Sequence, residues 1–161
     1  MHIDAMEARD AHDQRTDRNR TAIKEVFDFV ADETNEPRYN EDMVRCEKVT
    51  PGRIGVGTSY EAELNSTGAV PMTVEVTGFQ RPRRLESRAH IEATMDIRGA
   101  VTLEAIPAGT LMSWEWAVQP HGCMRLLGPF VARLGRRNEE RIGAGLKKLL
   151  EMRDEAAPAD Y

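Results

Sequence analysis

The feature that most constrains this chain is a series of strand-like segments followed by one long amphipathic segment. Between residues 44 and 118, apolar and polar side chains alternate along successive runs, which is typical of half-buried β-strands. In the clearest run, Met95, Ile97 and Leu103 share one side. From about residue 126 to 152, apolar residues recur at steps of three and four, the spacing of an amphipathic helix. The sequence therefore predicts an α+β fold in which a curved sheet wraps around one long C-terminal α-helix and encloses a cavity.

Short turns separate the strand-like runs. Pro51-Gly52 follows the first run, and Pro107-Ala108-Gly109 precedes the last one. Neighbouring strands joined by short turns pair antiparallel, because a parallel connection needs a long crossover. We therefore expect an antiparallel meander of roughly six strands.

The chain is predicted to form one domain with short polar ends. Its length of 161 residues is typical of a single domain. Residues 1–20 are rich in charge and poor in large apolar side chains, so we expect a polar extension, disordered or helical. The domain itself is expected to span residues 21–152, and residues 153–161 to form a C-terminal tail.

A short helix is predicted at the start of this domain. Ile23, Phe27 and Val30 recur at helical spacing, and the helix is expected to end near residue 32. Pro37 then breaks it, because proline disfavours helical geometry in the residue before it. We expect Tyr39 to Met43 to form a turn of irregular helix.

The C-terminal helix is predicted to carry an apolar stripe with one polar interruption. The stripe consists of Leu127, Val131, Leu134, Ile142, Leu146 and Leu149. Asn138 lies on the same face, four residues after Leu134 and four before Ile142. This amide is expected to contact a ligand, to form a structural hydrogen bond, or to be exposed through rotation of the helix, and the pattern leaves these three roles open.

Composition excludes several classes of protein. The net charge is −5, from 22 basic and 27 acidic residues, which argues against a general nucleic-acid binder. There is no apolar run of about 18 residues, so no membrane span is expected, and residues 1–20 contain no signal-peptide core. Cys46 and Cys123 form no CxxC pair, which is typical of reduced thiols in a cytoplasmic protein.

No catalytic or metal-binding motif is present in the sequence. It contains no GxSxG and no HExxH, and the four histidines are scattered. Arg88 and Arg98 are predicted to face outward, so no inward base or cation is evident. We therefore expect no metal and no cofactor, and the catalytic residues, if there are any, stay unknown.

What remains is an apolar lining with a few polar groups. Such a surface suits a small hydrophobic ligand, although any one of these side chains could instead simply fill the core. The candidate ligand-binding residues are Tyr39, Met43, Tyr60, Met72, Met95, Trp114, Trp116, Val131, Leu134 and Asn138.

Several short motifs, in a fixed order, resemble those of a known superfamily. They are residues 25–32 (EVFDFVAD), residues 37–40 (PRYN), residues 55–58 (GVGT), residues 82–85 (PRRL) and residues 120–122 (PHG). Together they make the chain similar to the START-like, or SRPBCC, helix-grip superfamily, and most similar to its polyketide cyclase/dehydrase-like group. The resemblance implies a helix-grip fold and, in other members, functions that range from cyclases to lipid and hormone carriers.

The chain departs from the family pattern in two places. Members usually have a β-strand just before the first helix, where this chain has the charged segment Arg9 to Arg20. An edge strand is thus expected to be missing, or to be supplied by a neighbouring subunit. Tyr39 stands where members often have tryptophan, which would change ligand preference.

Three functions follow from this resemblance and from the residues. The leading hypothesis is a protein that binds a small hydrophobic or aromatic molecule between the sheet and the C-terminal helix. The second is an enzyme of the polyketide cyclase/aromatase type. The third is a protein-interaction module with a vestigial cavity, which could form a homodimer through an open sheet edge.

Overall fold

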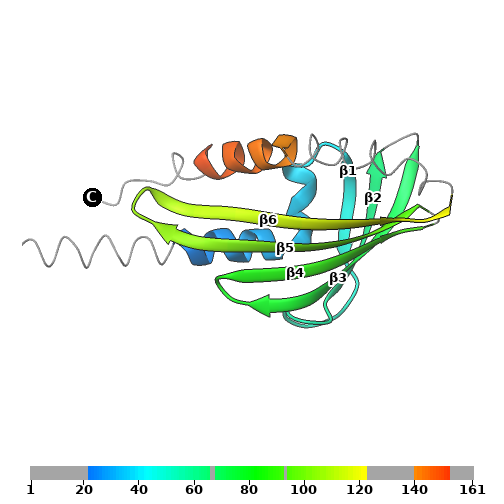
Figure 1. Cartoon of the computed structure of the whole chain (residues 1–161), viewed down its shortest axis with the longest axis horizontal. Coiled ribbons are helices and arrows are strands. Elements are labelled where there is room, and N and C mark those ends of the chain that lie inside the picture. Colours follow the sequence, from blue (N-terminus) through cyan, green and yellow to red (C-terminus); the bar gives the residue numbers. More distant parts are fainter. Residues whose placement is uncertain (1–21, 66–67, 93, 123–139, 153–161) are drawn as a thin grey trace, which may run out of the picture.

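The computed structural model describes residues 22–65, 68–92, 94–122 and 140–152. Its centre is a six-stranded antiparallel sheet in which every strand pairs with its neighbour in sequence (Figure 1). The strands are β1 (Met43–Lys48), β2 (Ser59–Asn65), β3 (Ala69–Gln80), β4 (Arg84–Ile91), β5 (Met95–Ile106) and β6 (Gly109–Pro120). The predicted α+β meander is confirmed.

Helical segments cover the concave face of this sheet. Residues 22–31 form the first helix, and residues 140–152 are helical near the C-terminal end of the chain (Figure 1). Leu146 of the C-terminal helix belongs to the same buried cluster as Ile23 and Phe27 of the first helix. The two helices therefore complete one hydrophobic core with the inner face of the sheet.

Alternation along the strands decides which side chains enter that core. On β3, Met72, Val74 and Val76 are buried while the residues between them face outward. Tyr60 and Leu103 are among the most deeply buried large side chains. The period-two pattern in the sequence thus predicted the inner face of the sheet correctly.

A 3₁₀-helix, η1 (Glu33–Arg38), connects the first helix to β1. Asp32 caps it, since its carboxylate accepts a hydrogen bond from the Thr34 backbone N–H at 3.2 Å. The expected irregular helix at residues 39–43 is therefore wrong in position, because η1 ends at Arg38 and Met43 begins β1. Because Asp32 caps η1, the helical turn lies closer to the first helix than expected.

The inner sheet holds this connection in place through Tyr60. Its buried hydroxyl donates a hydrogen bond to the Ala31 carbonyl at 3.2 Å, and it also interacts with the backbone of Glu33. On the other side of the junction, the Asn35 side-chain amide donates to the Phe29 carbonyl at 3.0 Å. The end of the first helix and the start of η1 are thus fixed relative to β2.

β1 and β6 form the two edges of the described sheet. The segment Arg9 to Arg20, which was expected to leave an edge open, lies outside the described residues. The polar extension 1–20 and the tail 153–161 lie outside them as well. In the part of the chain that the structure describes, no helix is both long and apolar enough to cross a membrane.

Candidate functional site

A cavity of about 230 Å³ lies between the concave face of the sheet, η1 and the C-terminal helix. Most of its wall is apolar, and one end is polar. The described lining residues are Val30, Glu33, Glu36, Tyr39, Asn40, Met43, Leu64, Met72, Val74, Leu85, Ser87, Ala89, Ile91, Ile97, Val101, Met112, Trp114, Trp116, Val118, Ile142 and Leu146.

The two tryptophans of β6 occupy this wall because glycines make room for them. Gly99 pairs with Trp116 across β5 and β6, and a Cβ at Gly99 would overlap the indole ring. A Cβ at Gly143 of the C-terminal helix would lie 2.6 Å from the ring of Trp114. Gly143, which lowers helix propensity, therefore allows a close approach between the helix and the sheet.

The polar end of the cavity is built by η1 and the residues just after it. Glu36 Oε1 accepts a hydrogen bond from Asn40 Nδ2 at 2.8 Å, and Asn40 Oδ1 accepts one from the Asp42 backbone N–H at 3.1 Å. Glu33 is only 9% exposed and forms a hydrogen bond with the Glu36 carboxyl group. Two carboxyl groups thus meet at one end of an apolar cavity.

Burial raises the pKa values of three groups at or near this end of the cavity. Desolvation, followed by the negative charge of Glu36, raises the pKa of Glu33 well above its usual value. Desolvation and the same two glutamates raise the pKa of the Tyr39 hydroxyl, and burial raises the pKa of the nearby Cys46 thiol to about 12. Glu33 is therefore suited to act as a neutral carboxylic acid that shares its proton with Glu36.

The described part of the cavity wall offers no basic side chain to balance these carboxyl groups. Among the described lining residues there is no lysine, arginine or histidine. Arg141 of the C-terminal helix forms an ion pair with Asp42, outside the cavity. In the described part of the site, the negative charge of Glu33 and Glu36 is therefore reduced by the proton that the two carboxyl groups share.

The structure places five of the ten predicted site residues on the described cavity wall and two others elsewhere in the core, and the remaining three lie outside the described residues. Those on the wall are Tyr39, Met43, Met72, Trp114 and Trp116. Tyr60 is fully buried in the core beneath η1, and Met95 packs against the core cluster, so neither is among the described lining residues. Val131, Leu134 and Asn138 lie outside the described residues.

Sequence reasoning missed Glu33, Glu36 and Asn40. It found no inward acid or base because it interpreted the segment after residue 32 as a break. One signal was available, since Glu33 follows Val30 by three residues and so continues the buried stripe of the first helix. The inward direction of Glu36 depends on the 3₁₀ geometry of η1, which that stripe does not predict.

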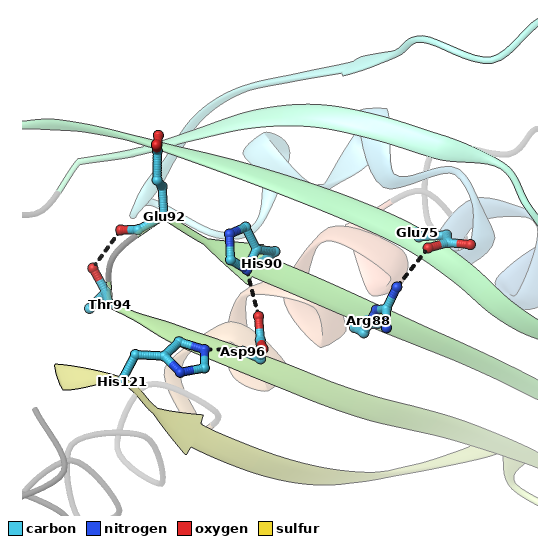
Figure 2. Close-up of polar contacts among 7 residues, drawn as sticks. All are labelled: Glu75, Arg88, His90, Glu92, Thr94, Asp96 and His121. Atoms are coloured by element: carbon cyan, nitrogen blue, oxygen red, sulfur yellow. Dashed lines mark hydrogen bonds and ion pairs between the residues drawn. The ribbon is translucent and has the colours of Figure 1, made fainter.

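The outer face of the sheet carries a different polar cluster (Figure 2). The Asp96 carboxylate lies between two imidazoles, 2.6 Å from His90 Nδ1 and 3.1 Å from His121 Nε2. Both histidines are exposed, and their hydrogen bonds lower the pKa of Asp96. Within the described ranges, no group of three or more His, Cys, Asp or Glu side chains could hold a metal ion.

The outer face also has a shallow groove of about 480 Å³. Arg84 and Arg88 line it, but each is paired with a glutamate, Glu86 at 2.7 Å and Glu75 at 3.2 Å. Its charges are therefore largely balanced by neighbours on the same face. The cavity on the inner face is the stronger candidate for a functional site.

Solved structures with similar folds support this architecture. A START superfamily protein from Mycobacterium smegmatis matches with a TM-score of 0.69 at 14% identity, covering 81% of this chain and 90% of that chain. A protein from Thermus thermophilus matches with a TM-score of 0.68 at 16% identity, covering 84% and 92%. Ara h 8.0201 matches with a TM-score of 0.61 at 13% identity, covering 82% and 90%. At these identities the similarity shows the helix-grip fold alone.

Sequence comparison assigns the family. No curated protein matches the chain closely enough to count as a relative. A family model described as "Polyketide cyclase / dehydrase and lipid transport" matches residues 19–151, which is most of the chain. The chain therefore belongs to the polyketide cyclase/dehydrase and lipid transport family, within the START-like superfamily.

Proposed function

We propose that this protein binds a small hydrophobic or aromatic molecule in the cavity between the sheet and the C-terminal helix. The observation that carries the proposal is the cavity itself, a space of about 230 Å³ with a mostly apolar wall and a few polar groups at one end. Apolar walls with few convergent polar groups are typical of small-molecule sites. The family, whose description includes lipid transport, agrees with such a role. A cytoplasmic location is part of the same proposal.

The size of the cavity limits the ligand. An engineered apolar cavity of about 150 Å³ accepts benzene, whereas drug-sized ligands occupy about 300 Å³ or more. The volume of about 230 Å³ lies between these values. We therefore expect a molecule with one ring or a short alkyl chain, rather than a long-chain lipid held entirely inside.

Native mass spectrometry of the purified protein, followed by solvent extraction, tests the binding function. We expect a small apolar molecule to remain bound, or an added one-ring compound to bind and change the fluorescence of Trp114 and Trp116, the only two tryptophans of the chain. Ala89→Leu should fill part of the cavity and weaken binding. Ala117→Leu, on the outer side of β6, is the matched control. A wild-type protein that takes up no apolar compound would contradict the proposal.

A second candidate function is catalysis of the polyketide cyclase/aromatase type. The observation that favours it is the buried Glu33 beside Glu36 on the cavity wall, because a carboxylic acid with a raised pKa is suited to polarise a ketone carbonyl. In such a reaction Glu33 would donate a hydrogen bond to the carbonyl oxygen. Glu36 would take a proton from the neighbouring carbon, and the resulting enolate would attack a second carbonyl of the same chain before water is lost.

Incubation with a short poly-β-ketone thioester tests the enzymatic function. We expect cyclised, dehydrated product to form faster than without protein, and Glu33→Gln to remove most of the acceleration. Glu61→Gln, an exposed substitution on β2, should leave the rate unchanged. Equal rates with wild type and Glu33→Gln would reject this role for Glu33.

Pairing of two copies through a sheet edge is a separate part of the proposal. β1 and β6 end the described sheet, and open edges favour pairing with another strand. Measuring the solution mass by light scattering tests it, with a dimer expected. A strict monomer at high concentration would reject it and would leave the binding function unaffected.

A further inference from the structure

Resting on the proposed binding function, the geometry points to one chemical class of ligand: a small one-ring molecule with a basic amine, whose ammonium group is held between Glu33 and Glu36. The inference combines the acid pair, the absence of a basic partner on the described wall, and the aromatic end of the cavity.

The acid pair lies on the cavity wall, with Glu33 buried and Glu36 half-buried. Glu33 is 9% exposed, and both it and Glu36 line the cavity. Asn40 Nδ2 donates to Glu36 Oε1 at 2.8 Å, which holds that carboxylate in place as an acceptor. A ligand that enters the cavity therefore meets two carboxyl groups whose positions are already fixed.

In the described part of the site, none of the titratable groups that act on the Glu33 carboxyl group is basic. These titratable groups, and those on which Glu33 acts in turn, are Asp32, which caps η1, Glu36 of η1, Tyr39 just after it, Cys46 of β1 and Tyr60 of β2. Each of these is either neutral or negative. A buried carboxylate beside a second, half-buried one favours either a shared proton or a cation, because their mutual repulsion is poorly screened there.

A ligand ammonium group would satisfy this requirement better than the proton does. It can donate hydrogen bonds to both carboxylates, and charge-assisted hydrogen bonds of this kind are about twice as strong as neutral ones. A neutral alcohol or ketone would leave the pair in its proton-sharing state. The charge of the pair thus favours an amine over an uncharged molecule of the same shape.

The remainder of the cavity suits an aromatic ring. Trp114, Trp116 and Met72 line it, and aromatic rings pack well against indoles and thioethers. The volume of about 230 Å³ leaves space for one ring and a short linker. An arylalkylamine therefore matches the apolar wall and the acid pair at the same time.

Binding of an amine should release a proton. The ligand enters as its ammonium form, Glu33 loses the proton that it shares with Glu36, and that proton passes to the buffer. The affinity is then expected to increase with pH until Glu33 is ionised in the free protein, and to fall above the pKa of the amine, which is about 10, like that of lysine. An uncharged ligand would show no such increase.

Titration calorimetry with 2-phenylethylamine and the uncharged 2-phenylethanol tests the inference. We expect the amine to bind the wild-type protein at least about tenfold more tightly than the alcohol near neutral pH. Measurements in two buffers of different ionisation enthalpy should show release of up to about one proton per bound amine.

Three variants test the residues. Glu33→Gln should abolish proton release and weaken amine binding about tenfold, and the double variant Glu33→Gln/Glu36→Gln should remove the preference for the amine. Glu61→Gln, which changes an exposed carboxylate on β2, should behave as wild type. Circular dichroism verifies that each variant is folded before it is titrated.

The outcomes separate this inference from the binding function. Equal affinities for amine and alcohol would overturn the amine assignment while leaving the cavity as a binding site. Unchanged amine binding and proton release in Glu33→Gln would overturn the assignment of that residue. If neither probe binds, the inference fails, and the apolar compounds recovered by mass spectrometry decide whether the binding function fails with it.

Discussion

On each side of the sheet a carboxyl group lies beside other titratable groups, and the pKa values of these two carboxyl groups are shifted in opposite directions. Desolvation and a second carboxyl group raise the pKa of Glu33 inside the cavity. Hydrogen bonds from two imidazoles lower the pKa of Asp96 on the outer face. The same functional group is therefore a proton donor on one face and a persistent anion on the other, because burial and partners differ.

The largest effect is expected from overpacking the inner face. Gly99→Val should destabilise the protein by about 3 kcal/mol, because the new side chain overlaps the indole of Trp116. Ala117→Val makes a similar change on the outer face of the neighbouring strand and should be nearly neutral. Urea denaturation followed by circular dichroism measures both. Equal losses would mean that the two faces are packed alike.

The next effect concerns the contact that positions η1. Tyr60→Phe should cost about 2 kcal/mol of unfolding free energy, because the buried Ala31 carbonyl loses its hydrogen bond. Tyr39→Phe is the control, since the Tyr39 hydroxyl takes part in none of the described hydrogen bonds. If both variants lose the same amount in urea denaturation, Tyr60 contributes through packing alone.

A smaller effect on the free energy of unfolding is expected from Glu33, and this effect should depend on pH. The pKa of Glu33 is higher in the folded than in the unfolded protein, so the folded state binds more protons and stability falls as pH rises above about 4.5. Glu33→Gln should lack this loss and become more stable than wild type by about 1 kcal/mol at pH 8, the size of a buried polar penalty. Unfolding free energies of the two proteins between pH 4 and pH 8 measure the difference. Parallel curves would show that Glu33 titrates normally.

The smallest effect is expected on the outer face. Because the pKa of Asp96 is lowered, its interactions stabilise the folded state above the pKa of an unfolded aspartate and are lost as pH falls through the folded value. Asp96→Asn should therefore cost a small amount of unfolding free energy at pH 6, and high salt should remove most of the difference. Melting temperatures at two salt concentrations measure it. A large, salt-independent loss would show that this cluster is structural rather than superficial.

The sheet and its inner face could be predicted from the sequence because strand alternation is a local property. Met72, Trp114 and Trp116 were assigned to the cavity side from their spacing alone, and they line the cavity. Tyr60 was assigned to the same face, which is correct, but its depth beneath η1 depends on the packing of a distant helix. The two-residue period of a strand alone cannot distinguish a residue that fills the core from one that lines a cavity.

The acid pair could not be predicted in the same way. Glu33 and Glu36 belong to a short 3₁₀-helix whose direction is set by contacts with the sheet and the first helix, through Tyr60 and Asn35. Such contacts join residues up to 29 positions apart. A charged residue in a short connecting segment is ordinarily exposed, so the charge of these two residues favoured the prediction that they face solvent.

The meander order of the sheet also has a consequence for folding. Every strand pairs with its neighbour in sequence, so the sheet can form one hairpin at a time with small loop-closure costs. The contact of Gly143 with Trp114 joins more distant parts of the chain and is expected to form late. Changes at that contact should then accelerate unfolding and leave the folding rate almost unchanged.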